Sequence, residues 1–341
     1  MRDLITGGAG FIGSHLADRL VAIGSEVLIL DDFSTGRRRN VQHLLGGAAS
    51  NGHGPSRVEL IEGSTSDVDL VDELIGSVDR CFHLASAVGV ELVVDRPLDS
   101  LLRNVRGSDN VFASAARHGV RLLFTSTSEI YGKNSNGALV EDSDRLLGPT
   151  QTARWGYANT KAFGEMLAFG YHREHGAETI VARLFNTVGP RQLGTYGMVV
   201  PRLVAQALAG RELTVYGDGT QSRCFAHVAD TVEALALLAE HDDAIGNAYN
   251  VGSPAEVTIL ELAHEVIART GSDSGVVLVP YEEAYREGFE ELGRRRPDIT
   301  RVERLTGWRP RRALEQVLDD VIDYQRRIGA PDALGAGALT A

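Results

Sequence analysis

The chain has 341 residues, of which 43% are hydrophobic and 23% charged, so it can bury one large core or two linked ones. Its formal net charge of −12 argues against a nucleic-acid partner. Two cysteines are too few for a disulfide framework and fit a reducing cytoplasm. We expect no membrane segment and no leader peptide, because no apolar run could cross a bilayer and the chain starts directly with a strand.

Short apolar runs rich in β-branched residues alternate with amphipathic stretches along the first half of the chain. The runs lie at 3–6, 26–31, 58–62, 80–85, 121–126 and 179–185, and the clearest helical stretches lie at 11–24, 70–78 and 104–119. This alternation predicts an α/β fold with a doubly wound parallel sheet of the Rossmann type.

The alternation loosens after about residue 185, which predicts a smaller C-terminal α+β domain for binding substrate. We assign residues 1–184 and about 223–250 to the Rossmann domain, and about 185–222 and 251–326 to the smaller one. The Gly/Ser-rich stretch 44–57 is predicted to be a mobile surface loop, and 327–341 a disordered tail.

A glycine-rich loop follows the first predicted strand. The stretch TGGAGFIG places Gly7, Gly10 and Gly13 between that strand and a helix, where glycine permits a tight turn and close approach to a pyrophosphate. The second strand ends in LILDD, and Asp31 there can accept from ribose hydroxyls and would repel a 2′-phosphate. The order of strand, loop and helix indicates a dinucleotide site, and Asp31 favours NAD over NADP, although the arginines at 37–39 could favour a phosphate.

Tyr157 and Lys161 are four residues apart, hence on one face of a predicted helix. A lysine ammonium beside a phenol favours the phenolate, which can take a hydroxyl proton as a hydride leaves for a nicotinamide. Alone, this spacing usually reflects an exposed tyrosine–lysine pair. After a dinucleotide loop and the strand end TSTS, it favours a catalytic pair.

Glu129 follows directly on the buried strand VRLLFTSTS. A carboxylate in that place either faces solvent or serves a site. The arginines at 294–296 pose the same choice, because a basic cluster is often only a solvated surface.

These motifs together resemble the extended short-chain dehydrogenase/reductases, the family of nucleotide-sugar epimerases, dehydratases and decarboxylases. The resemblance covers nearly the whole chain: TGGAGFIGSH, FHLAS, TSTSEIYG, YANTKAFGE, ARLFNTVGPRQ, LTVYGDGTQSRCFAHVAD, NVGSP and GWRPRRALEQVLDDVI. It implies NAD as cofactor, a nucleotide-sugar substrate, a homodimer and no metal site.

The resemblance also implies the roles of individual residues. Thr127 would hydrogen-bond the sugar hydroxyl beside Tyr157, with Lys161, Glu129 and Arg295 completing the catalytic set. The implied cofactor-binding residues are Gly7, Gly10, Phe11, Ile12, Gly13, Asp31, Asp32, Ser64, Leu84, Ala85, Ser86, Asn104, Tyr157 and Lys161. The implied substrate-binding residues are Ser128, Asn186, Arg191, Val199, Arg202, Tyr216, Arg223 and Arg295.

TSTSE together with RRRPDI resembles the UDP-glucuronate decarboxylases (UDP-xylose synthases) and the decarboxylase domain of the bacterial polymyxin-resistance enzyme. In both groups an arginine before a basic residue and proline faces the active site, and Arg295 matches it. The dTDP-glucose 4,6-dehydratases carry Asp-Glu after the threonine, and Ser128 breaks that pattern. The GDP-mannose 4,6-dehydratases share T-S-E but have a different, NADP-type glycine loop.

The resemblance implies oxidation at C4 of a uronic acid, giving a β-keto acid that loses CO₂ because its electrons delocalise into the ketone. Arg295 would hold the carboxylate, and Glu129 would orient Arg295, exclude water or relay a proton. The product would be UDP-xylose or a UDP-4-keto-pentose. A 4-epimerase, a 4,6-dehydratase and a non-catalytic NAD(H)-sensing protein are the alternatives.

Two stretches depart from the pattern. ASAVGVELVVDRP replaces the proline-rich, sugar-facing loop of the UDP-xylose synthases, and Ser64 stands where many relatives have aspartate near the adenine. The nucleotide base stays open, because uridine, thymidine and guanosine sugars all bind this scaffold. For the dimer, the resemblance implies a four-helix seam that buries Phe163, Met166, Leu167 and Phe169.

Overall fold

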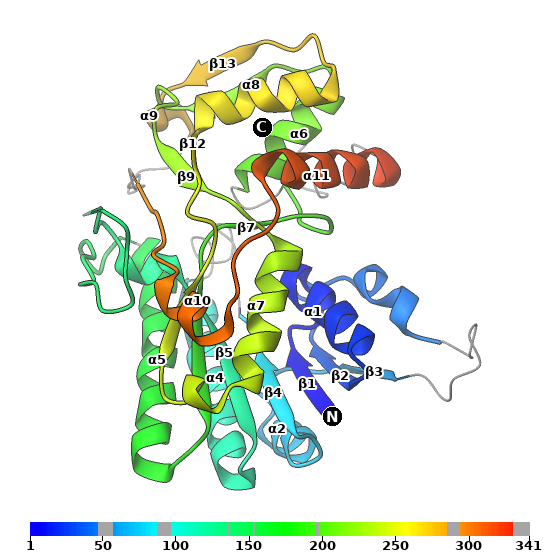
Figure 1. Ribbon diagram of the computed structural model, residues 1–341, viewed down its shortest axis with the longest axis vertical. Helices are drawn as coiled ribbons and strands as arrows, with labels where there is room; N and C mark the ends of the chain where they lie inside the picture. Colours follow the sequence, from blue (N-terminus) through cyan, green and yellow to red (C-terminus); the bar gives the residue numbers. More distant parts are fainter. Residues whose placement is uncertain are drawn as a thin grey trace.

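A seven-stranded parallel sheet forms the centre of the larger part of the molecule (Figure 1). The computed structural model describes residues 1–46, 57–86, 97–135, 137–152, 154–194, 198–284 and 294–329. The strands are β1 (Arg2–Thr6), β2 (Glu26–Asp31), β3 (Val58–Glu62), β4 (Arg80–His83), β5 (Arg121–Thr127), β6 (Thr179–Leu184) and β11 (Ala248–Val251). Their order is β11-β6-β5-β4-β1-β2-β3, so the strand order reverses between β1 and β4. In such sheets ligands bind at the carboxyl ends beside this reversal.

Neighbouring residues of each strand point to opposite faces, which explains the apolar runs. Ile5 packs with helices α1 (Phe11–Ala22), α7 (Val228–Glu240) and α10 (Thr300–Thr306). Leu4 packs on the other face with helices α2 (Val68–Ile75), α4 (Pro97–His118) and α5 (Arg154–His175). Both residues are fully buried, as a doubly covered sheet requires.

A second, smaller core lies beyond the carboxyl ends of the strands, at the top of Figure 1. Its helices are α6 (Val199–Leu208), α8 (Ile259–Thr270) and α11 (Leu314–Ile328). The short strands pair as β8 (Leu213–Tyr216) with β13 (Val276–Val279), β9 (Ser222–Cys224) with β12 (Glu256–Thr258), and β7 (Thr187–Val188) with β10 (Ala226–His227). The remaining elements are α9 (Tyr281–Ala284) and the 3₁₀ turns η1 (Arg38–Asn40), η2 (Gln42–Leu44), η3 (Ser128–Tyr131) and η4 (Asp242–Ala244).

Side chains fix the start of α8. Thr258 accepts a hydrogen bond from the Glu261 amide, and the Glu261 carboxylate accepts from the Thr258 amide, which is a complete capping box.

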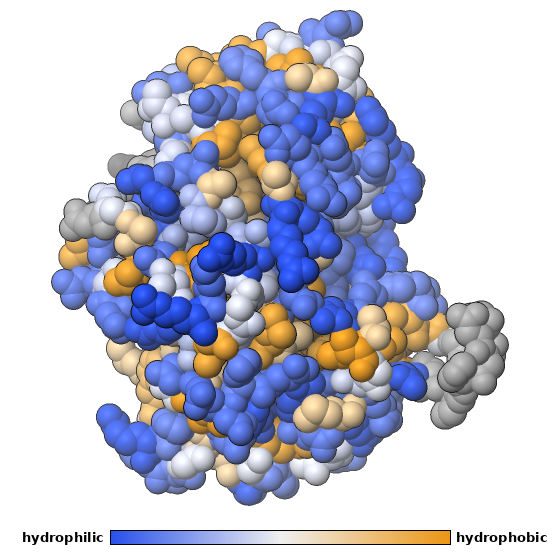
Figure 2. Space-filling model, viewed as in Figure 1, coloured by the Kyte–Doolittle hydropathy of each residue, from blue (hydrophilic) through white to orange (hydrophobic). Residues whose placement is uncertain are grey.

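The view in Figure 2 shows mostly hydrophilic side chains, with hydrophobic ones in separate patches.

The predicted fold class is confirmed, and all six predicted strand runs form strands of the sheet. The sequence analysis did not mark β11 as a strand. Helix α4 begins seven residues before the predicted start at 104, and α10 packs on the sheet although it lies within the range expected for the smaller domain.

Two predicted irregular segments lie largely outside the described residues. Of the loop expected at 44–57, the structure describes 44–46 and 57, and Leu44 belongs to η2. Of the tail expected at 327–341, Arg327 and Ile328 are helical, because α11 ends at Ile328. None of the helices in the described ranges is long and apolar enough to cross a membrane.

Candidate active site

The glycine loop turns tightly at the carboxyl end of β1. Gly7 has a φ of +71°, and a Cβ there would lie 2.8 Å from the backbone nitrogen of Ala85. A Cβ on Gly13 would lie 2.3 Å from the Gly7 carbonyl oxygen, whereas one on Gly10 would meet only that same oxygen at 3.1 Å. Gly10 precedes α1 with no side-chain cap, so the amides of the first turn are available to a phosphate. The loop fits a dinucleotide pyrophosphate.

Asp31 lies at the end of β2 beside this loop and is 6% exposed. Its carboxylate accepts from the backbone amides of Ala9 at 2.8 Å and Phe33 at 2.9 Å, and burial raises its pKa. Each oxygen keeps a second lone pair, so a ribose hydroxyl can still donate to it. Gly36 leaves space for this carboxylate, because a Cβ at position 36 would lie 2.4 Å from Asp31 Oδ1.

The other predicted cofactor residues surround the same end of the sheet. Phe11 and Ile12 begin α1, and Leu84 packs with them against the core on the α1 face of the sheet. The Ser86 hydroxyl donates to Asn104 of α4 at 3.2 Å. Asp32 accepts from the Ser34 hydroxyl, and Ser64 accepts from the Ser66 amide.

His83 ends β4 and is 1% exposed. Its Nδ1 lies 2.7 Å from the Thr6 hydroxyl and its Nε2 lies 3.1 Å from the Ser108 hydroxyl. Burial and the nearby Lys161 lower the pKa of His83 to about 3. The imidazole is therefore neutral, and its hydrogen bonds fix the strand end beneath the cofactor site.

Tyr157 and Lys161 project from α5 toward β5. Lys161 is 5% exposed, and its Nζ donates to the Thr125 carbonyl at 2.8 Å and lies 4.8 Å from the centre of the Phe124 ring. Gly164 allows this close approach, because a Cβ there would lie 2.5 Å from that ring. Burial lowers the pKa of Lys161 to about 7.

The Thr127 hydroxyl bonds the phenol of Tyr157. The resemblance implied a bond from Thr127 to the sugar hydroxyl beside Tyr157, and that bond stays a prediction. Burial and the charge of Glu129 raise the pKa of that phenol, while the bond from Thr127 lowers it. Thr127 also accepts from the Glu129 amide at 3.2 Å, which places Glu129 in the first turn of η3 beside the phenol.

Glu129 and Arg295 form an ion pair between Oε1 and Nη1 across 166 residues of sequence. The Arg295 side chain is 8% exposed and that of Glu129 24% exposed. Neither residue is a solvated surface group. The carboxylate at the end of the buried strand holds an arginine that arrives from the C-terminal part of the chain.

The predicted substrate residues, apart from Ser128, all follow β6 in the chain. Asn186 donates to the Cys224 carbonyl at 3.0 Å, Arg223 donates to the Ser222 carbonyl at 2.7 Å, and Arg202 lies 4.3 Å from the centre of the Tyr216 ring. Val199 opens α6, and Ser128 is buried at the start of η3. Arg191 instead pairs with Asp18 of α1, at 2.8 Å between Nη1 and Oδ2.

The sequence analysis missed a buried polar group behind the site. Arg183 of β6 binds the Glu165 carboxylate, with 2.7 Å between Nη2 and Oε2, and both residues are at most 8% exposed. Glu165 lies one turn after Lys161, and its charge raises the pKa of Lys161 against the effect of burial. The spacing of four residues between Lys161 and Glu165 on one helix was the sequence signal that could have identified Glu165.

Comparison with known proteins agrees with this geometry. The model of the NAD dependent epimerase/dehydratase family matches residues 4–252, and the chain belongs to that family. The chain is 39% identical to a UDP-N-acetyl-alpha-D-glucosaminuronate decarboxylase of Bacillus cytotoxicus, over 96% of this chain and 98% of the relative. It is 38% identical to UDP-glucuronic acid decarboxylase 1 of Danio rerio, over 96% of this chain and 73% of the relative.

Among solved structures, UDP-glucuronic acid 4-epimerase from Bacillus cereus, in complex with UDP-glucuronic acid and NAD, has a TM-score of 0.84. It is 26% identical and covers 96% of this chain and 100% of its own. The cofactor of this protein is NAD, as the glycine loop and Asp31 predicted.

Proposed function

We propose that the protein is an NAD-dependent nucleotide-sugar decarboxylase that acts on UDP-glucuronate through a 4-keto intermediate. The observation that carries this proposal is the buried Glu129–Arg295 pair beside Tyr157. Simple 4-epimerisation needs neither a buried arginine nor its acidic partner. Arg295 donates to Glu129 through Nη1, and a guanidinium carries five N–H donors, so other N–H groups of Arg295 can donate to a substrate carboxylate.

The residues divide the reaction between them. The glycine loop and Asp31 would hold NAD, which would supply the acceptor for the hydride of the sugar. Tyr157 takes the proton of the C4 hydroxyl, and Thr127 orients that phenol. The sequence predicted that the Lys161 cation lowers the pKa of this phenol, but burial and the charge of Glu129 raise it, and burial lowers the pKa of Lys161 itself to about 7. The proposed role of Lys161 therefore belongs to its protonated form, which donates to the Thr125 carbonyl.

The resulting β-keto acid loses CO₂ because the electrons of the breaking bond delocalise into the ketone. Arg295 holds the carboxylate in line, and Glu129 fixes Arg295 or relays the proton that replaces CO₂.

A second substrate, UDP-N-acetylglucosaminuronate, is favoured by the name of the Bacillus relative, which this chain matches over 98% of its length. Both sugars are uronates, so the Glu129–Arg295 pair suits either one. They differ at C2. The stretch ASAVGVELVVDRP, where the sequence departs from the UDP-xylose synthases, lies mainly outside the described residues.

Incubation with each nucleotide sugar, followed by mass spectrometry, tests the proposal. We expect loss of CO₂ from at least one uronate, giving UDP-xylose, a UDP-4-keto-pentose or their acetamido counterparts. Arg295→Ala should weaken uronate binding about 10- to 100-fold, because a charge-assisted bond is worth about 1.5–3 kcal/mol. A product of unchanged mass that separates from the substrate by chromatography would identify an epimerase, and loss of water a dehydratase; either would overturn the proposal.

We also propose a homodimer formed by α4 and α5. These helices expose Phe163 (42%), Met166 (61%), Leu98 (68%) and Leu102 (39%), which is unusual for side chains of this size. The seam implied by the resemblance changes in one respect. Leu167 and Phe169 pack mainly against the core of their own chain.

The two cores support a division of labour between cofactor and substrate. We propose that residues 1–184 with about 223–250 bind NAD, and that most of 185–222 and 251–326 binds the nucleotide sugar.

Both cysteines are buried and free, which supports the cytoplasm as the compartment.

A further inference from the structure

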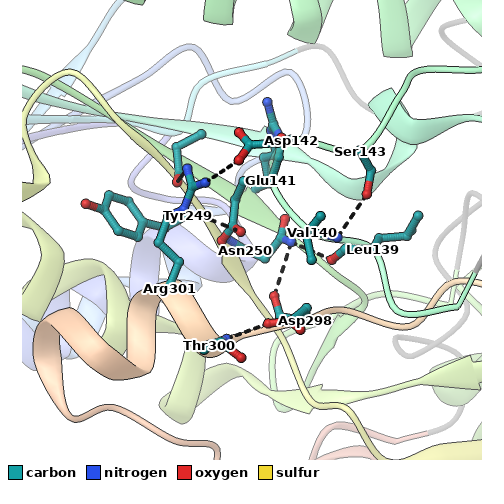
Figure 3. Close-up of polar contacts among 12 residues, drawn as sticks. Leu139, Val140, Glu141, Asp142, Ser143, Tyr249, Asn250, Asp298, Thr300 and Arg301 are labelled. Atoms are coloured by element: carbon teal, nitrogen blue, oxygen red, sulfur yellow. Dashed lines mark hydrogen bonds and ion pairs between the residues drawn. The ribbon is translucent and has the colours of Figure 1, made fainter.

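Asn250 lies in β11, the edge strand of the large sheet, and is fully buried. Its side-chain nitrogen donates to the carbonyls of Leu139 at 2.8 Å and Asp298 at 3.2 Å. Its side-chain oxygen accepts from the Tyr131 hydroxyl at 2.7 Å. Figure 3 shows the Asn250 amide between Leu139 and Asp298. One amide thus bonds three separate segments.

Two of these segments lie side by side as a short parallel bridge between Leu139 and Pro297. The Leu139 amide donates to the Arg296 carbonyl at 2.8 Å, and the Asp298 amide donates to the Leu139 carbonyl at 2.9 Å. Asn250 donates to this same Leu139 carbonyl, so it fixes the bridge to the sheet. Arg295 immediately precedes Arg296, whose carbonyl accepts the first hydrogen bond of the bridge.

The third segment is η3, which carries Glu129. Tyr131 ends η3, is fully buried and also accepts from Arg183 at 2.9 Å. The Asn250 side chain therefore bonds, through its two ends, the segments that carry both members of the Glu129–Arg295 pair.

We propose that Asn250 is a positioning residue that sets Arg295 against Glu129 and the sugar carboxylate. This inference rests on the proposed uronate decarboxylation. Asn250 touches neither member of the pair, and it acts through the backbone of the Arg295 segment and through Tyr131. The Arg294–Glu256 pair, at 2.7 Å between Nε and Oε1, holds the other side of Arg295.

The test variant is Asn250→Asp, which keeps the size and one acceptor but replaces the two donors by an oxygen facing two carbonyls. We expect C4 oxidation to persist while CO₂ release slows about 10- to 100-fold, since small misplacements cost that much. Measured by calorimetry in a Tyr157→Phe background, the preference for UDP-glucuronate over UDP-glucose should fall. A purely structural role would lower the melting temperature without changing this preference.

Asp142→Asn is the matched control. Asp142 lies three residues after Leu139, on the segment that Asn250 bonds, and pairs with Arg301 at 2.8 Å between Oδ2 and Nη2. Its side chain is 82% exposed. It should behave as wild type. If Asn250→Asp does not fold, Tyr131→Phe provides a second variant, because it removes only the hydroxyl that donates to Asn250. It should also lower the preference for UDP-glucuronate over UDP-glucose, but by a smaller factor.

The outcomes separate the two proposals. A wild-type protein that releases no CO₂ and shows no preference for a uronate contradicts the proposed function. The proposed role of Asn250 is tested separately, in a wild type that prefers the uronate and loses this preference in Arg295→Ala. If Asn250→Asp or Tyr131→Phe then keeps the full preference, Asn250 does not position Arg295.

Discussion

The chemistry of the site depends on three side chains whose environments differ sharply. Lys161 is buried with its pKa lowered to about 7, while burial and Glu129 raise the pKa of Tyr157. Thr127 is shared, because it bonds the phenol of Tyr157 and caps the turn that carries Glu129. In the proposed mechanism, the residue that orients the base therefore also places Glu129, so one geometry serves both the oxidation and the loss of CO₂.

Tyr157→Phe should fold and bind NAD but lose C4 oxidation by about 10²–10⁴-fold, because it removes the proposed general base. Absorbance of NADH in a single turnover measures this step. Tyr171→Phe is the matched control, since Tyr171 lies on the same helix with its hydroxyl bonded to Asp109 at 3.2 Å. Near-normal oxidation in Tyr157→Phe would place the base elsewhere.

His83 gives the protein a specific acid sensitivity. Its pKa falls from 6.5 to about 3 in the folded state, so between these values the unfolded chain binds a proton that the folded one does not. Stability from this group is present above 6.5 and falls with pH through that window, at up to about 1.4 kcal/mol per pH unit.

His83→Gln should therefore lose less stability than wild type as the pH falls through the same window. Urea unfolding at several pH values measures the slopes. His264→Gln, at an exposed position of α8, controls for loss of a histidine. Parallel slopes for His83→Gln and wild type would mean that His83 is protonated in the folded protein.

At the level of elements, the two faces of α5 have different proposed functions, one in the active site and one in the dimer seam. Its inner face carries Lys161 and lies close to β5 because of Gly164, while its outer face carries Phe163 and Met166. The residues Tyr157 and Lys161 could be predicted from the sequence because helical spacing is local. The role of Gly164 could not, since the Phe124 ring that it accommodates comes from a distant strand.

Met166→Asp should convert the proposed dimer to a monomer, because it places a charge in the apolar seam between two copies of α5. Light scattering at micromolar concentration measures the mass. Leu278→Asp is the control, since Leu278 is 52% exposed on β13, in the other part of the molecule. A dimer that survives Met166→Asp together with Phe163→Asp would exclude this face as the interface.

At the level of the whole molecule, the site joins residues that the sequence keeps far apart. The glycine loop and the tyrosine–lysine pair are local patterns, so both could be predicted from the sequence alone. Glu129 and Arg295 could each be proposed by resemblance, but their contact depends on how the segment before α10 crosses the end of the sheet. Asn250 begins the motif NVGSP, but no local pattern shows which distant segments a buried asparagine side chain will bond.

The most direct test of the central claim, that Glu129 and Arg295 serve the loss of CO₂ rather than the oxidation, is Glu129→Gln. This change keeps size and hydrogen bonding but removes the charge. With UDP-glucuronate, NADH absorbance and CO₂ release are followed side by side in a single turnover. We predict that the NADH signal persists while CO₂ release slows. Equal loss of both signals would place Glu129 in the first step, as an orienting group for Tyr157, and would contradict the account.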